Sequence, residues 1–281
     1  MATMALNYRA IPGAPLLNLD TDELARDYDR ISSTRQFEFG KQLVADLGIR
    51  AGDRVLDIGT GTGMLAHYMA EVVGPSGRVH GIDPLPSRIH IALDRARNRS
   101  NLSFEVSDVY DIDHLRDQSY DVVVANSVFN WLPEKTPALL TFWRVLRPAG
   151  RVGISAVAKG PRLPMQEIVS TVLAEPPFDR YPRARDSLTF KVDAEEMRAL
   201  FEMTGFAPSL IDVRQIEQHY PTAEQAVRFL EASSFGNFLG HLPVDLVYRA
   251  RVTILRRLAS IATERGIVQQ RGRLVAIAHR R

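Results

Sequence analysis

Three glycines at alternate positions follow a short apolar run, and this stretch constrains the fold more than any other. Residues 55–63 read Val-Leu-Asp-Ile-Gly-Thr-Gly-Thr-Gly. The apolar residues suit a buried strand, and glycine lets the backbone turn sharply next to a ligand. Residues 64–73 are good helix formers. Strand, glycine turn and helix together predict a nucleotide-binding corner, where amides at the helix start meet a negative ligand group.

The spacing of the glycines distinguishes between two kinds of nucleotide ligand. Dinucleotide-binding turns have the pattern G-x-G-x-x-G/A. Gly59 and Gly61 fit that pattern, but Gly63 comes one residue early, so that the pattern here is G-x-G-x-G. The early third glycine argues against a dinucleotide-dependent oxidoreductase, although this alternative stays open.

Three acidic residues belong to three separate apolar segments. Asp57 stands two residues before the first glycine, Asp83 follows the apolar residues of 78–84, and Asp108 follows those of 102–109. A single acid in such a place is explained by a solvated strand end or a helix cap. Three together would repel one another if left empty, so they predict a ligand rich in hydroxyls, amines and a sulfonium.

With the segments that follow, these motifs resemble those of class I S-adenosylmethionine-dependent methyltransferases. The resemblance covers roughly residues 25–158 and includes a fourth strand at 120–127 and a helix end, turn and fifth strand at 144–154. It implies an α/β fold with a Rossmann-like seven-stranded methyltransferase sheet, helices on both faces and a helical cap over the acceptor pocket. It also implies S-adenosyl-L-methionine as cofactor. Ala149 stands where the family often has glycine, and we expect it to be harmless if its φ is negative.

The resemblance also implies which residues bind the cofactor. Asp83 is placed to accept hydrogen bonds from both ribose hydroxyls. In the family an acid at the Asp108 position accepts from the adenine amino group, and the next residue, Val109, packs on the ring. Tyr28 and Gln36 resemble residues at the methionine end of the cofactor and at its entrance, with plain helix surface as the alternative. The full predicted set is Tyr28, Gln36, Asp57, Gly59, Thr60, Gly61, Gly63, Asp83, Pro84, Asp108, Val109 and Asn126.

The chain divides into a core and insertions. We predict an N-terminal arm and lid helix at 1–35, a cofactor-binding Rossmann-like core at 36–158, a lid insertion at 159–187, the core continued at 188–220, a helical cap insertion at 221–266 and a final core strand at 267–281. We expect the final strand to run antiparallel beside the sixth. The insertions and the N-terminal helices are interpreted as a lid over the acceptor; contacts between copies of the chain are the alternative, and both are compatible.

Catalysis of methyl transfer does not require a particular residue, because transfer from a sulfonium is an in-line displacement that positioning accelerates. Glu167 is one candidate catalytic residue, because terpenoid C-methyltransferases of this fold use a glutamate in that region as a base; the alternative is an exposed helix charge. His241 is the other candidate, as a base near neutral pH, with a helix-capping histidine as the alternative. Phe129 and Trp131 either wall the acceptor pocket or belong to the core.

Composition excludes several classes of chemistry. The chain has no cysteine, which removes disulfides, thiolate catalysis and thiolate metal sites, together with the arsenic-binding cysteines of arsenite methyltransferases. We find no acidic cluster for a metal, and no basic run with interleaved aromatics for nucleic acid. No long apolar segment or signal peptide is evident, so we expect a cytoplasmic protein without a membrane partner.

The sequence therefore predicts a methyltransferase that acts on a small-molecule acceptor, by O- or C-methylation in secondary metabolism. A sharper hypothesis is a prenyl diphosphate C-methyltransferase, in which Arg180, Arg183 and Arg185 bind the diphosphate. A homologue that binds the cofactor without catalysis is the alternative. A homo-oligomer is compatible with the sequence.

Overall fold

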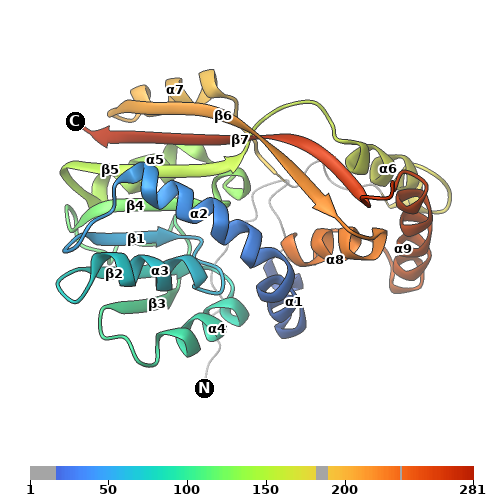
Figure 1. Cartoon of the computed structure of the whole chain (residues 1–281), viewed down its shortest axis with the longest axis horizontal. Coiled ribbons are helices and arrows are strands. Elements are labelled where there is room, and N and C mark those ends of the chain that lie inside the picture. The colour runs from blue at the N-terminus through green and yellow to red at the C-terminus, as the bar shows by residue number, and fades with distance from the viewer. Residues whose placement is uncertain (1–16, 182–188, 235) are drawn as a thin grey trace.

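A seven-stranded sheet forms the centre of the molecule in the computed structural model, which describes residues 17–181, 189–234 and 236–281. The strands lie in the order β3-β2-β1-β4-β5-β7-β6 (Figure 1). They are β1 (Arg54–Ile58), β2 (Arg78–Asp83), β3 (Leu102–Val106), β4 (Tyr120–Asn126), β5 (Leu146–Val157), β6 (Phe206–Tyr220) and β7 (Ile267–Arg280). The first five strands are parallel, and β7 is antiparallel to both β5 and β6. The predicted sheet and its antiparallel last strand are confirmed.

Helices pack on both faces of this sheet, and others stand beyond it (Figure 1). They are α1 (Asp22–Asp27), α2 (Ser33–Leu47), α3 (Met64–Val73), α4 (Pro86–Ala96), α5 (Lys135–Val145), α6 (Pro164–Leu173), α7 (Ala194–Met203), α8 (Ala223–Ser233) and α9 (Val244–Ala259), with a π-helical turn η2 (Tyr28–Ser32) and 3-10 turns η1 (Leu17–Leu19), η3 (Phe129–Trp131) and η4 (Phe178–Arg180). In β4, Val122 and Val124 pack with α2 and α3, whereas Val123 and Ala125 pack with α5 and α7. Alternate side chains of a strand point to opposite faces, so an uninterrupted apolar strand is buried on both.

A cap made of α6, α8 and α9 stands beyond the sheet, on the right in Figure 1, where β6 and β7 extend past the other strands. The cap has a hydrophobic cluster of its own, which includes Val172 of α6, Phe229 of α8 and Ile254 of α9. Arg257 of α9 also pairs with Glu175, after α6, at 2.5 Å. Helices from both of the segments predicted as insertions therefore pack together as one cap.

The turn at Ala149 does not meet the condition set from the sequence for a harmless alanine, namely a negative φ. Its φ is +62°, in the left-handed region. The reason is a register shift, since Tyr120 pairs with Leu146 but Val122 pairs with Arg151. The extra residues of β5 must loop out, and this turn requires a left-handed residue. For a residue with a Cβ, that conformation costs about 1 kcal/mol of free energy.

Candidate functional site

The glycine turn connects β1 to α3 at the carboxyl edge of the sheet. Gly59 and Gly61 have φ values of +66° and +57°. A Cβ built on Gly59 would lie only 2.4 Å from Cγ2 of Val128, so backbone conformation and packing both require glycine there. Gly63 has a different role, because a Cβ there would lie 2.6 Å from Cζ of Phe104. The third glycine therefore lets α3 pack closely against β3.

Asp57 is buried beneath this turn, with 2% of its surface exposed. Thr60 Oγ1 donates to Asp57 Oδ2 over 2.7 Å. Burial raises the pKa of the Asp57 carboxyl to about 7; the Thr60 hydrogen bond opposes the shift, and the charge of Asp83 adds to it. A cationic group next to Asp57 would favour the ionised carboxylate.

Two further carboxylates stand beside Asp57 at the same edge. Asp83 ends β2 and accepts hydrogen bonds from the backbone N–H groups of Gly61, over 2.9 Å, and Leu85, over 3.0 Å. Asp108 follows β3, which ends two residues earlier, and accepts from the N–H of Tyr110 over 2.9 Å. Burial raises the pKa of both carboxyls. Each carboxylate offers about four acceptor positions, so both keep acceptors for a ligand.

Two cavities lie over the turn and share Tyr28, Gln36, Gly59 and Asn126 in their walls. Their volumes are about 80 and 30 Å³. Every residue of the predicted cofactor-binding set except Gly63 lines one cavity or both. The fold thus brings together residues from six separate segments of the chain, which the sequence motifs assign to one ligand.

Tyr28 forms the part of the wall that comes from the N-terminal helices. Its hydroxyl donates to Gln36 Oε1 over 2.7 Å, and burial raises its pKa to about 12. The Arg88 guanidinium lies over the Tyr28 ring, 3.9 Å from the ring centroid. Arg88 also pairs with the buried Asp20 at 3.2 Å and donates to the Ala232 carbonyl of α8 over 3.1 Å. Arg88 therefore joins the N-terminal segment, α4 and the cap around the cavities.

Comparison with known proteins decides the family. A family model described as a methyltransferase domain matches residues 49–200, more than half of the chain. The chain belongs to this family. The match contains the glycine turn and all three carboxylates, and it confirms the predicted class I methyltransferase, a class whose cofactor is S-adenosylmethionine.

Individual relatives cover the chain to different extents. Arsenite methyltransferase from Halobacterium salinarum is 41% identical over 112 residues, which are 38% of this chain and 28% of that protein. Demethylmenaquinone methyltransferase from Staphylococcus aureus is 26% identical over 198 residues, 65% of this chain and 81% of that protein. The solved structure of SpnF, called a [4+2]-cyclase, covers 87% of this chain and 80% of its own with a TM-score of 0.55 and 19% identity. The chain therefore spans little more than a quarter of the Halobacterium relative, and the likeness to SpnF shows the fold alone.

The predicted catalytic residues of this chain lie outside the walls of the two cavities. Glu167 is exposed on α6, and His241 lies in the turn before α9; neither lines a cavity. Arg180 is exposed at the end of η4, and Arg183 and Arg185 lie outside the described residues. The roles assigned to these side chains therefore stay predictions.

Other wall residues were missed or left open by the sequence-based predictions. Trp131 lines the larger of the two cavities, whereas Phe129 is fully buried in the core, so the two aromatics differ in role. Leu17 and Ser233 also line it, and no local motif marks them. Ser127 had a signal, because it directly follows β4 at the edge where ligands bind in parallel sheets; its φ of +64° is a strained conformation of the kind that gathers at functional sites.

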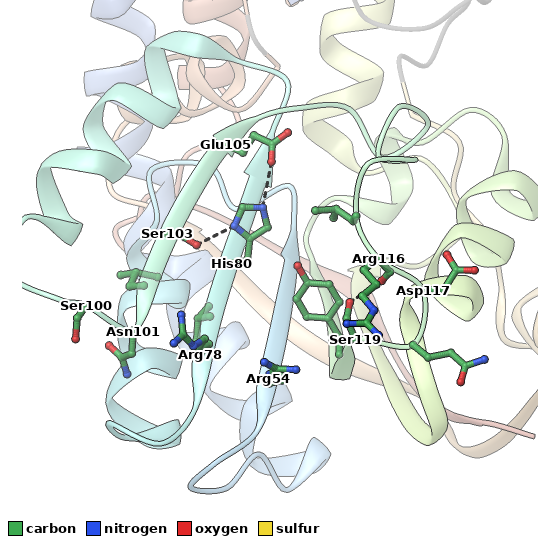
Figure 2. Close-up of a pocket in the computed structure, with 15 residues that line it drawn as sticks. Arg54, Arg78, His80, Ser100, Asn101, Ser103, Glu105, Arg116, Asp117 and Ser119 are labelled. Atoms are coloured by element: carbon green, nitrogen blue, oxygen red, sulfur yellow. Dashed lines mark hydrogen bonds and ion pairs between the residues drawn. The ribbon is translucent and has the colours of Figure 1, made fainter.

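A third cavity of about 960 Å³ lies away from the glycine turn. Figure 2 shows Arg54 and Arg78, which begin β1 and β2, so this cavity reaches the amino ends of the strands. Its polar groups contact one another: His80 Nδ1 lies 2.9 Å from Ser103 Oγ, and His80 Nε2 lies 3.3 Å from Glu105 Oε2. Size alone thus does not identify the cofactor site. Across the described part of the chain, no helix is long and apolar enough to cross a membrane, and no three His, Asp or Glu side chains gather as they would around a metal.

Proposed function

We propose that this protein transfers a methyl group from S-adenosylmethionine to a small-molecule acceptor bound between the sheet and the cap. The single observation that carries the proposal is the position of the glycine turn and the Asp57, Asp83 and Asp108 carboxylates around two cavities with common wall residues, in a chain of the methyltransferase family.

The residues present fit this cofactor. Its α-amino group would meet Asp57, whose burial and raised pKa make a cationic partner favourable. Its ribose hydroxyls would donate to Asp83, and its adenine amino group to Asp108, whose neighbour Val109 lines the same cavity and would pack on the ring. The bound cofactor supplies an electrophilic methyl group on its sulfonium.

The contribution of the protein to the reaction is then orientation and exclusion of water. The Tyr28–Gln36 hydrogen bond and the Arg88–Asp20 pair hold the N-terminal segment over the cavities. Holding two reactants in line converts a bimolecular displacement into an effectively unimolecular step. A base becomes necessary only if the acceptor must lose a proton, and Glu167 and His241 keep that role as hypotheses.

The acceptor is proposed to differ from that in the name of the Halobacterium relative. Trivalent arsenic is a soft centre that pairs with thiolates, as soft metals do, and the chain contains no cysteine. A carbon or oxygen nucleophile of a secondary metabolite, including a prenyl diphosphate, is the hypothesis that we keep.

A second candidate function is cofactor binding without methyl transfer. It is favoured by one specific observation, namely that the fold is shared with SpnF, which is called a cyclase. Two measurements separate the candidates. Calorimetry should show binding of S-adenosylmethionine and none of NAD, and incubation with a panel of small acceptors should release S-adenosylhomocysteine. Binding without release from any acceptor would favour the second candidate, and absence of binding would contradict both.

A further inference from the structure

Four cationic side chains gather beside the cofactor cavities without a carboxylate partner. Arg271 and Arg273 lie on β7, Arg35 on α2, and Lys191 in the segment before α7. We call these four residues the basic cluster. Within the described residues, none of the four forms an ion pair with an Asp or Glu, although many exposed arginines of this chain do.

Burial makes this arrangement costly. Arg273 is 3% exposed, and burial followed by the charge of Arg271 lowers its pKa to about 9. Burial and the same neighbouring charge also lower the pKa of Lys191, and burial lowers that of Arg271. Like charges that are gathered away from water destabilise a fold unless an opposite charge joins them.

Several buried atoms in and around the basic cluster lack a hydrogen-bond partner. They include Nη1 of Arg35 and Nε of Arg271, together with Nε2 of Gln218 and Oε1 of Gln269. The strand register pairs Gln218 with Gln269 and Ile216 with Arg271. Gln269, Arg271 and Arg273 occupy every second position of β7, so their side chains point to the same face of the strand. Buried polar groups are nearly always satisfied by protein, water or ligand, so these atoms point to a missing polar partner.

The basic cluster is connected to the wall of the cofactor site. Arg273 Nη2 donates to Asn126 Oδ1 over 2.8 Å and to Ser127 Oγ over 2.9 Å. Both residues line the 80 Å³ cavity. Arg271 lies two residues before Arg273 on β7, which separates their Cα atoms by about 7 Å. Arg35 follows at the cap side, 5.1 Å from the ring centroid of Tyr220 at the end of β6. Cationic groups thus extend from the cofactor site toward the cap, on the side where an acceptor would approach.

We infer that the acceptor carries an oxyanion, a carboxylate or phosphoryl group, which binds between Arg35, Lys191 and Arg271, while Arg273 positions Asn126 and Ser127. This inference rests on the proposed function and specifies its substrate class. Guanidinium groups suit both oxyanions through paired N–H donors. The basic cluster also assigns anion binding to residues other than Arg180, Arg183 and Arg185.

Binding of simple anions to the whole protein tests the inference. The probes are inorganic phosphate and acetate, each at constant ionic strength balanced with chloride, in the presence of S-adenosylhomocysteine. We expect phosphate, acetate or both to raise the melting temperature of the wild type, and the more effective probe to identify the oxyanion. Arg271→Gln and Lys191→Gln should each weaken that binding at least tenfold. Arg256→Gln is the matched control, since Arg256 is exposed on α9 with no ion pair to described residues.

A second readout separates ligand binding from a structural role. Because Arg271 is half-buried beside the like charges of Arg273 and Lys191, Arg271→Gln should raise the melting temperature of the protein free of these anions, whereas Arg256→Gln should leave it unchanged. Equal anion binding by Arg271→Gln and Arg256→Gln, or no effect of either anion on the wild type, would overturn the inference. Calorimetry with S-adenosylmethionine on the same samples tests the proposed function separately: intact cofactor binding without an anion effect refutes only the oxyanion site.

Discussion

The backbone N–H of Gly61 donates to the Asp83 carboxylate over 2.9 Å and thereby ties the glycine turn to the tip of β2. A Cβ on Gly61 would lie 3.3 Å from the Tyr28 ring and hydroxyl, so this position also sets how closely the N-terminal helices approach. One hydrogen bond therefore fixes the turn and orients a carboxylate in the cavity wall. These contacts shape the proposed cofactor site, and they lead to the following predictions.

Asp83→Asn should weaken binding of S-adenosylmethionine by about 1–3 kcal/mol, because hydrogen bonds to a charged group are lost. This corresponds to a Kd about 5- to 150-fold higher. Asparagine keeps an acceptor for only one of the two backbone N–H groups, Gly61 or Leu85, that Asp83 satisfies, so the melting temperature should also fall. Titration calorimetry measures the effect, with Asp113→Asn as control, since that carboxylate is fully exposed. An unchanged Kd in Asp83→Asn would contradict the placement of the ribose.

Cofactor affinity should depend on pH through Asp57. Its pKa in the empty folded protein is about 7, so the carboxyl is protonated below that pH. An ammonium group prefers the carboxylate, and binding must then release a proton. The Kd for S-adenosylmethionine should rise about tenfold per unit of pH below 7 and level off above it. Asp57→Asn should bind weakly at every pH, without this slope. A flat profile in the wild type would show that Asp57 does not meet the amino group.

The same carboxyl should lower the stability of the empty protein at high pH. Folding raises its pKa from the ordinary value of 3.8 to about 7, so its stabilising contribution is complete below pH 4 and is lost as the pH rises through 7. Asp57→Asn should therefore melt at a higher temperature than the wild type at pH 8, and at nearly the same temperature at pH 4. Scanning calorimetry at both pH values provides the comparison, and a lower melting temperature of the variant at pH 8 would refute this assignment.

Arg88→Gln should destabilise the fold by about 3 kcal/mol, because it leaves the buried Asp20 carboxylate without its charge partner. It should also increase hydrogen exchange in α1, η2 and α8, which Arg88 joins. Arg97→Gln is the control at the end of the same helix; its pair with Asp94 is exposed and should contribute at most about 1 kcal/mol. Equal effects of the two substitutions on denaturant unfolding would show that Arg88 does not hold these elements together.

Ala149→Gly should stabilise the protein by about 0.5–1 kcal/mol. Glycine adopts the left-handed conformation at φ +62° without the steric penalty of a Cβ, and this gain exceeds the entropy that glycine adds to the unfolded chain. Urea unfolding provides the measurement. A loss of stability would indicate that the Ala149 methyl group contributes packing that outweighs its strain.

Much of the wall of the proposed cofactor site was predictable because its signals are local. The glycine spacing and the three acids follow from turn chemistry and from the rule that parallel strands present their carboxyl ends at one edge. In the sheet, β3, β2 and β1 are neighbours, so the carboxyl ends of these three strands lie side by side. The starts of two helices also have local capping residues: Thr21 accepts from Leu24 N at the start of α1, over 3.2 Å, and Asp193 forms a capping box at the start of α7.

The remaining features depend on tertiary contacts that no local pattern encodes. Arg88 lies in an ordinary amphipathic helix, and only the fold brings Asp20 and Ala232 to it, from 68 and 144 residues away. Arg271 and Arg273 stand two residues apart in a terminal strand, where arginines usually face solvent, yet Arg273 is buried and lies over the Phe39 ring of α2. The sequence alone favoured Arg180, Arg183 and Arg185, three arginines within one short stretch, as the source of cations for the acceptor.

A crystal structure of the protein with S-adenosylhomocysteine examines the whole assignment at once. We predict the ribose hydroxyls at Asp83, the amino group at Asp57 and the adenine amino group at Asp108, with the glycine turn against the ligand. A ligand bound elsewhere, such as in the 960 Å³ cavity at the opposite strand ends, or three carboxylates without ligand contacts, would contradict it.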